Sequence, residues 1–143
     1  MSSLFSSSRS GLSNAAEYVT SGLPFAFSAA ASTTAQEIKF PYVTNFISVH
    51  NADDTNDLEV GFTENGLAGS NKFFVAPGET RYLKIRIKTL FVASSAGTPI
   101  FDVVAGMTQI LSKELPILTG SATQGTTGSF PFYEHTFGYN GIG

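Results

Sequence analysis

Side chains alternate between two faces over residues 81–88, RYLKIRIK. One face carries Arg81, Leu83, Ile85 and Ile87, and the other carries Tyr82, Lys84, Arg86 and Lys88. A period of two predicts a β-strand with one buried and one solvated face, and it matches no single stripe of an α-helix. Pro77-Gly78 suits the centre of a type II turn, where proline fixes the first φ and glycine supplies a positive φ. We therefore expect residues 72–92 to form a hairpin near the middle of an antiparallel sheet.

Other segments with strand-like patterns recur at short intervals between turn-rich stretches. They are residues 23–30, 36–40, 43–51, 58–63, 90–93 and 99–110. With the hairpin they give about eight strands and no convincing helix, which predicts an all-β sandwich or barrel. Residues 64–71, rich in Gly and Asn, are expected to form a loop, and Gly106 a bulge or a point of close contact.

The alternation also predicts which side chains form the core. A register error of one residue would bury Lys84 and Arg86 and expose Leu83 and Ile85, so the choice is testable. The expected inward set is Phe40, Ile47, Val49, Leu58, Val60, Phe62, Leu83, Ile85, Ile87, Phe101 and Val103.

The two ends of the chain differ in composition from this middle part. Residues 1–22 are rich in Ser, Gly, Ala and Thr, which predicts either a disordered tail or an arm that orders against neighbouring subunits. Residues 23–112 form the expected domain, and residues 113–143 form a C-terminal extension. Residues 120–129 of this extension, GSATQGTTGS, have the composition of a linker. Aromatic residues crowd the end of this extension, and we expect them to dock on the domain or on a neighbour: Phe130, Phe132, Tyr133, Phe137 and Tyr139.

Composition narrows the class of protein. The chain has 143 residues, no Cys, 13% charged residues and a net charge of −3. The absence of Cys excludes disulfides and thiol catalysis, and the acidic balance argues against a general nucleic-acid binder. So few charges suggest that much of the surface meets other protein. The sequence predicts no transmembrane segment and no signal peptide.

No arrangement of side chains predicts chemistry. The two histidines, His50 and His135, lie in different settings, and no nucleophile, zinc or phosphate-binding motif occurs. We therefore expect no enzyme activity, no cofactor and no metal. The acidic residues Asp53, Asp54, Asp57 and Glu59 could offer a calcium site, but a solvated turn is the simpler interpretation.

Half of the eight basic residues lie between residues 81 and 88, and they are Arg81, Lys84, Arg86 and Lys88. Lys84, Arg86 and Lys88 could keep an outer face soluble, bind nucleic acid, or contact a partner. The partner hypothesis places them against Asp53, Asp54 or Asp57 of another copy. The aromatic end could be a carbohydrate platform, although packing is the better interpretation because the chain has no Trp.

An ordered set of segments resembles the vertex (penton) proteins of large icosahedral double-stranded DNA viruses, with algal large DNA viruses the nearest likeness. The segments are VTNFISVHN, LEVGFTENGLAGSNKFFVAPGET, KTLFV and VVAGMTQI. They lie in order within residues 40–110, a stretch that covers about half of the chain. The resemblance implies a single jelly roll of eight strands in two four-stranded sheets. It also implies five copies at each capsid vertex, in contact with neighbouring major and minor capsid proteins, and no catalytic residues.

These implications place the protein in the virion, at a capsid vertex assembled in the host cell, without direct contact with nucleic acid. The alternative from another class is a β-sandwich binding module, such as a carbohydrate-binding or fibre-attachment domain. A binding module predicts a monomer, whereas a penton predicts a ring.

Overall fold

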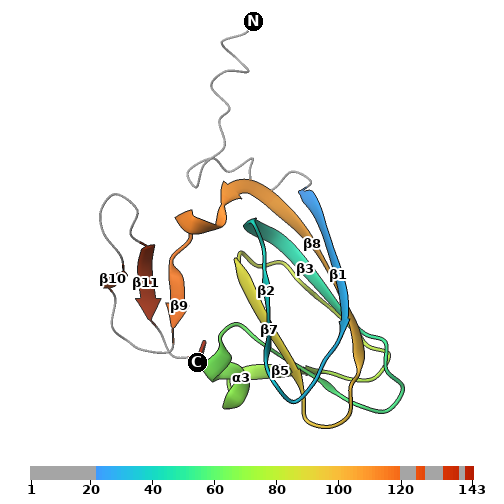
Figure 1. Cartoon of the computed structure of the whole chain (residues 1–143). Coiled ribbons are helices and arrows are strands. Elements are labelled where there is room, and N and C mark those ends of the chain that lie inside the picture. The colour runs from blue at the N-terminus through green and yellow to red at the C-terminus, as the bar shows by residue number, and fades with distance from the viewer. Residues whose placement is uncertain (1–21, 120–124, 128–133, 139–140) are drawn as a thin grey trace, which may run out of the picture.

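The computed structural model describes residues 22–119, 125–127, 134–138 and 141–143. Eight of its strands form two antiparallel four-stranded sheets, stacked face to face (Figure 1). The first sheet has the order β1-β8-β3-β6, with bounds Leu23–Ala30, Ile100–Leu111, Tyr42–Asn51 and Thr80–Leu83. The second has the order β2-β7-β4-β5, with bounds Gln36–Lys39, Thr89–Ser94, Leu58–Gly61 and Lys72–Val75.

The pairing of these strands defines the topology. Strand β1 pairs with β8, β2 with β7, β3 with β6 and β4 with β5, so the first half of the chain folds back strand by strand against the second half. This is the order of a jelly roll, in which a long antiparallel ribbon wraps into two sheets. The predicted all-β, single jelly-roll fold is confirmed.

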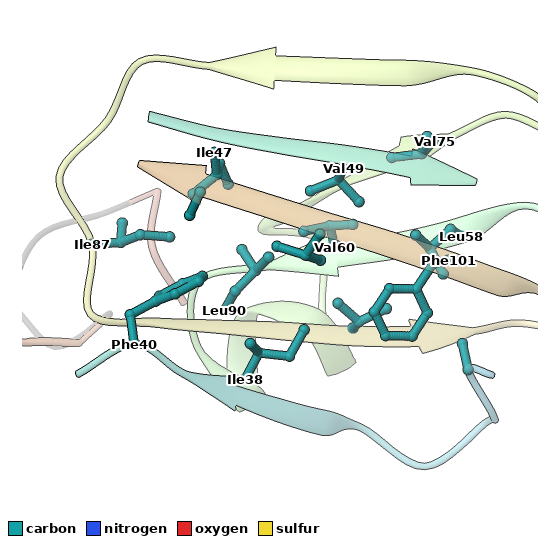
Figure 2. Packing of buried hydrophobic residues seen from close by; sticks show 14 of the residues in the cluster. Ile38, Phe40, Ile47, Val49, Leu58, Val60, Val75, Ile87, Leu90 and Phe101 are labelled. Atoms are coloured by element: carbon teal, nitrogen blue, oxygen red, sulfur yellow. The ribbon is translucent and has the colours of Figure 1, made fainter. Parts of the chain in front are cut away.

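The core fills the space between the two sheets, and Figure 2 shows side chains from both sheets meeting there. The expected inward residues are all in or against this core, although Phe62, Leu83 and Ile85 are only half-buried at its margin. Lys84 and Arg86 are exposed. The predicted register is therefore correct, because a slip of one residue would have reversed these assignments.

The prediction that residues 72–92 form a hairpin is wrong. The turn itself forms, with φ of 75° at Gly78 and a hydrogen bond of 2.9 Å from the Glu79 amide to the Ala76 carbonyl. However, β5 before the turn belongs to the second sheet and β6 after it belongs to the first, and each lies at an edge. The turn is thus a corner between sheets, because β5 finds its partner in β4 and β6 finds its partner in β3.

The strand expected to continue from residue 81 ends early, at Leu83. Strand β3 carries register irregularities between Tyr42 and Thr44 and between Thr44 and Phe46, where the ladder to β6 would otherwise continue. Residues 84–88 keep the alternation of exposed and buried side chains without ladder pairing. Gly106 is a close-contact point as expected, since a Cβ there would collide with the Phe46 ring.

The loop expected at residues 64–71 contains a short helix, α3 (Glu64–Ala68). The Thr63 hydroxyl caps it by accepting a hydrogen bond of 2.9 Å from the Gly66 amide. Asn65 and Gly66 are weak helix formers, so this cap and the burial of Leu67 stabilise a helix that local propensity disfavours.

The C-terminal region adds structure beside the sandwich. After a 3-10 turn, η1 (Ser112–Glu114), come β9 (Ile117–Thr119), β10 (Gly125–Thr127) and β11 (Glu134–Gly138), which form a sheet in the order β10-β11-β9 (Figure 1). Strand β11 runs parallel to β9 and antiparallel to β10. Strand β10 lies within the stretch that the sequence suggested was a linker.

Candidate functional site

The basic segment, residues 84–88, is held against β3 by one buried hydroxyl. The Thr44 Oγ1 donates to the Ile85 carbonyl at 2.9 Å and accepts from the Ile87 amide at 3.0 Å. The Thr44 amide donates to the Ile87 carbonyl at 3.0 Å. Because Ile85 and Ile87 are thereby directed to the core, the side chains between them face solvent.

The three cations of this segment do not share one role. Lys84 and Arg86 are exposed, whereas Lys88 is half-buried and donates from Nζ to the Leu115 carbonyl at 3.0 Å. Lys88 therefore ties the basic segment to the chain that leaves the sandwich. The exposed side chains of Lys84 and Arg86 are accessible to a partner.

The acidic loop, residues 52–57, follows the other end of β3. The Asp53 carboxylate accepts hydrogen bonds from the amides of Asn56 and Thr55 at 2.7 and 3.0 Å. These bonds, that from Asn56 first, lower the pKa of Asp53 below its usual value of 3.8. Asp54 and Asp57 are exposed. Among the described residues, no group of three or more potential ligands could hold a metal ion.

The acidic loop and the basic segment lie at opposite ends of the sandwich. The loop begins directly after Asn51, and the segment is bound at Thr44 of the same strand. Seven residues of extended chain separate these points, or about 23 Å. The predicted charge pairing can therefore form only between copies, with the strand ends of one copy meeting the opposite ends of the next.

A groove of about 300 Å³ lies where the second sheet meets the C-terminal region. Apolar side chains dominate its walls, and Glu37, Glu64 and Lys88 stand among them. It is lined by Glu37, Phe62, Thr63, Glu64, Ile87, Lys88, Thr89, Phe91, Leu115, Pro116, Ile117 and Leu118. The sequence pattern did not predict this groove. The apolar run at residues 115–118, which lines the groove, is the feature of the sequence that could have indicated it.

The C-terminal residues contact the start of α3, beside the groove. The Thr63 hydroxyl, which caps α3, also donates to the Ile142 carbonyl at 2.8 Å. Ile142 is buried, with 3% of its surface exposed. The chain therefore returns to the second sheet after β11.

Some of the remaining predicted residues lie in strands, and others lie outside the described part of the chain. His50 lies on β3, its Nδ1 is 2.9 Å from the Thr80 hydroxyl, and its register partner on β8 is Asp102. The backbone of Phe137 pairs with Leu118 between β11 and β9, and that of His135 pairs with Thr126. The aromatic residues Phe130, Phe132, Tyr133 and Tyr139 lie outside the described residues, so their docking stays a prediction.

The comparisons with known proteins identify no family for this chain. The chain matches no protein-family model, and it matches no curated protein. A solved structure of Bacillus endospore appendages, described as a novel family of disulfide-linked pili, is similar with a TM-score of 0.42 and 16% identity, over 61% of this chain and 87% of the other. That similarity is too low to support an argument about function. In the part of the chain that the structure describes, no helix is long and apolar enough to cross a membrane.

Proposed function

We propose that this protein is a structural capsid protein that forms the pentameric vertex of an icosahedral double-stranded DNA virus. It acts by self-association and by contact with neighbouring major and minor capsid proteins. On this proposal the protein resides in the virion after assembly in the host cell, binds no nucleic acid directly, and has no catalytic activity.

The observation that carries the proposal is where the penton-like segments fall in the fold. VTNFISVHN lies in β3, and LEVGFTENGLAGSNKFFVAPGET spans β4, α3, β5 and the corner turn. KTLFV leads into and covers most of β7, and VVAGMTQI lies in β8. The resemblance therefore follows the jelly roll through both sheets and is not confined to one hairpin. Because fold alone does not imply function, this ordered match is the stronger argument.

The outer face of the first sheet also supports self-association. Its outward residues at the centre are small, apolar or uncharged, and include Val104, which is 47% exposed, and Tyr82, which is 61% exposed. Asp102 is the acidic residue on the described part of this face. Depletion of charge with retained aromatic residues is typical of the centre of protein–protein interfaces.

The test is the mass of the full chain in solution. We expect native mass spectrometry to give five times the chain mass of 15.1 kDa, and negative-stain images to show five-fold rings. A monomer at all concentrations, or a ring with another number of copies, would contradict the proposal.

The groove favours a second candidate, a β-sandwich binding module. Phe62 and Phe91 line it together with ionisable side chains, and pockets of about this size bind small ligands. This candidate expects a monomer that binds an oligosaccharide, with affinity lost in Phe91→Ala. Calorimetry with a panel of oligosaccharides, together with the native mass, separates the two candidates.

A further inference from the structure

Four strands lie at the edges of the two sheets, and three of them carry features that oppose pairing with another chain. Strands β2, β5 and β6 have four residues each. Strand β2 carries the ion pair of Glu37 with Lys39 at 3.9 Å, β5 begins with Lys72, and β6 contains Arg81. Short length and charge are the usual means by which proteins protect sheet edges.

Strand β1 has little of this protection, since Pro24 near its start removes one backbone donor and no other such feature follows in the strand. It has eight residues, LPFAFSAA, none of them charged. In the described part of the chain it pairs with β8 on one side and ends the sheet on the other (Figure 1). A long, uncharged edge is the kind of strand that accepts an additional strand.

The hydrogen bonding to β8 shows which groups face the free edge. The Ala31 amide donates to the Pro99 carbonyl at 2.8 Å, so Ala31 points its backbone groups toward β8. Backbone groups alternate in direction along an antiparallel strand, so Ala26, Ser28 and Ala30 point theirs away from β8. All three side chains are exposed. The free edge of β1 thus offers three residues with both a donor and an acceptor.

We propose that the free edge of β1 accepts residues 1–21 of a second copy of this chain as an added strand. This inference rests on the proposed function, because it names the contact that would join neighbouring copies around the ring. Each copy then donates one arm and accepts one, and such a head-to-tail contact gives a ring when the rotation between copies closes.

The sequence of the arm fits this role. Residues 1–21 contain no proline, so every amide after the first can donate to a ladder, and Arg9 and Glu17 are their charged side chains. Fully extended, 21 residues reach about 70 Å at most, which exceeds the width of a domain of this size. The C-terminal region is a poorer donor, since Pro131 lies within it and part of it already forms the sheet of β9, β10 and β11.

The start of β1 indicates that the acceptor belongs to another copy. A Cβ on Gly22 would come within 2.7 Å of the backbone of Gly106 and Met107, so Gly22 lies close against β8. The arm of the same copy would have to reverse direction at this point to reach the opposite side of β1. A neighbour can supply its arm without such a reversal.

The first test removes one donor from the free edge. Ser28→Pro in the full chain leaves the ladder to β8 intact, because the Ser28 amide points away from β8. Glu37→Pro is the matched control, since the Phe40 amide donates to the Lys88 carbonyl and so directs the Glu37 amide to the free edge of β2. We expect Ser28→Pro to weaken self-association at least tenfold, measured by the concentration dependence of the native mass, and Glu37→Pro to leave it unchanged. Equal association of Ser28→Pro and the native chain overturns the proposal.

The second test identifies the occupant and does not depend on a proline variant that folds. Copies with Ser28→Cys are mixed with copies that carry one cysteine in the arm, at Ser6, Ser10 or Asn14, and are mildly oxidised. The native chain has no Cys, so every disulfide reports an introduced pair. We expect a disulfide between unlike copies for at least one arm position, and none when Glu37→Cys replaces Ser28→Cys. Cross-links only between two Ser28→Cys copies would show β1 paired with β1 and overturn the proposal.

The two proposals can fail separately. A five-copy ring without cross-links from the arm to Ser28→Cys overturns the added strand and leaves the vertex function standing. Cross-links in an assembly of another number of copies uphold the added strand and overturn the pentamer.

Discussion

Asn51 joins three segments at one end of the sandwich. Its side-chain amide donates to the carbonyls of Asn56 and Val75 at 2.8 and 3.0 Å, and its side-chain oxygen accepts from the Asp53 amide at 3.0 Å. The residue is fully buried. One side chain therefore fixes the end of β3, the acidic loop and the end of β5.

We expect Asn51→Ala to lower the free energy of unfolding by about 1–3 kcal/mol for each buried group left without a partner. Urea denaturation measures this change. Ser28→Ala, on the exposed face of β1, is the control and should stay within about 0.5 kcal/mol of the native chain. An unchanged unfolding midpoint for Asn51→Ala would show that water replaces its hydrogen bonds.

Asp53 makes the stability of the acidic loop depend on pH. Its folded-state pKa lies below the ordinary value of 3.8 because backbone amides donate to the carboxylate. A depressed pKa contributes stability that is present above the unfolded pKa and is lost as the pH falls through the folded one. We expect carbon-detected NMR titration to give Asp53 a pKa below 3.8. We also expect Asp53→Asn to remove part of the stability difference between neutral and acidic solution, measured by urea denaturation at both pH values.

Hydrogen bonds from the Thr44 side chain hold the basic segment in position, as ladder hydrogen bonds hold a strand beside its neighbour. Thr44→Val keeps the shape of the side chain but removes the hydroxyl that binds the Ile85 carbonyl and the Ile87 amide. We expect a loss of about 1–3 kcal/mol in unfolding free energy and faster amide exchange at residues 85–88, measured by hydrogen–deuterium exchange. Thr98→Val, at an exposed site in the loop before β8, is the control. Unchanged exchange at Ile87 would show that core packing alone holds the segment.

Local pattern predicted the elements well and their partners poorly. Alternation fixed the inward faces of the strands, because burial of one face requires a period of two. The corner at Pro77-Gly78 could not be told from a hairpin turn, since its turn chemistry is the same. What distinguishes it is distant in sequence: the Gly78 amide donates to the Asn51 carbonyl at 2.9 Å, and this bond directs the chain to β3.

The candidate sites show the same division. The sequence identified the exposed cations Lys84 and Arg86, because strand alternation places them outward. It could not separate Lys88 from them, because the Leu115 carbonyl that binds Lys88 lies 27 residues further along the chain. The groove and α3 also depend on such contacts, since Ile142 approaches Thr63 across 79 residues of sequence.

At the scale of the whole molecule, charged side chains are scarce. The chain has 13% charged residues, and within the described residues several of these are engaged inside the copy. Glu59 pairs with Lys72, Glu79 lies 3.2 Å from Arg81, and Asp53 holds its own loop. Exposed Asp54 and Asp57 lie at one end of the sandwich, and exposed Lys84 and Arg86 lie at the other.

This separation makes the charge contact between copies testable by reversal. We expect Lys84→Glu combined with Arg86→Glu to weaken ring assembly, because the acidic loop of the next copy would then face like charge. Restoring opposite charges, with Asp54→Lys and Asp57→Lys added to the same chain, should recover assembly. Each exposed pair contributes only about 0–1 kcal/mol, so the change comes from the number of contacts closed around the ring and from slower association.

Because salt screens such pairs, raising its concentration from about 0.05 to 0.5 M should weaken the native ring, and it should weaken the ring of the fourfold variant to a similar extent. Native mass spectrometry and light scattering measure both effects. Assembly that ignores salt and both sets of substitutions would assign these charges to solubility alone and leave the free edge of β1 as the contact between copies.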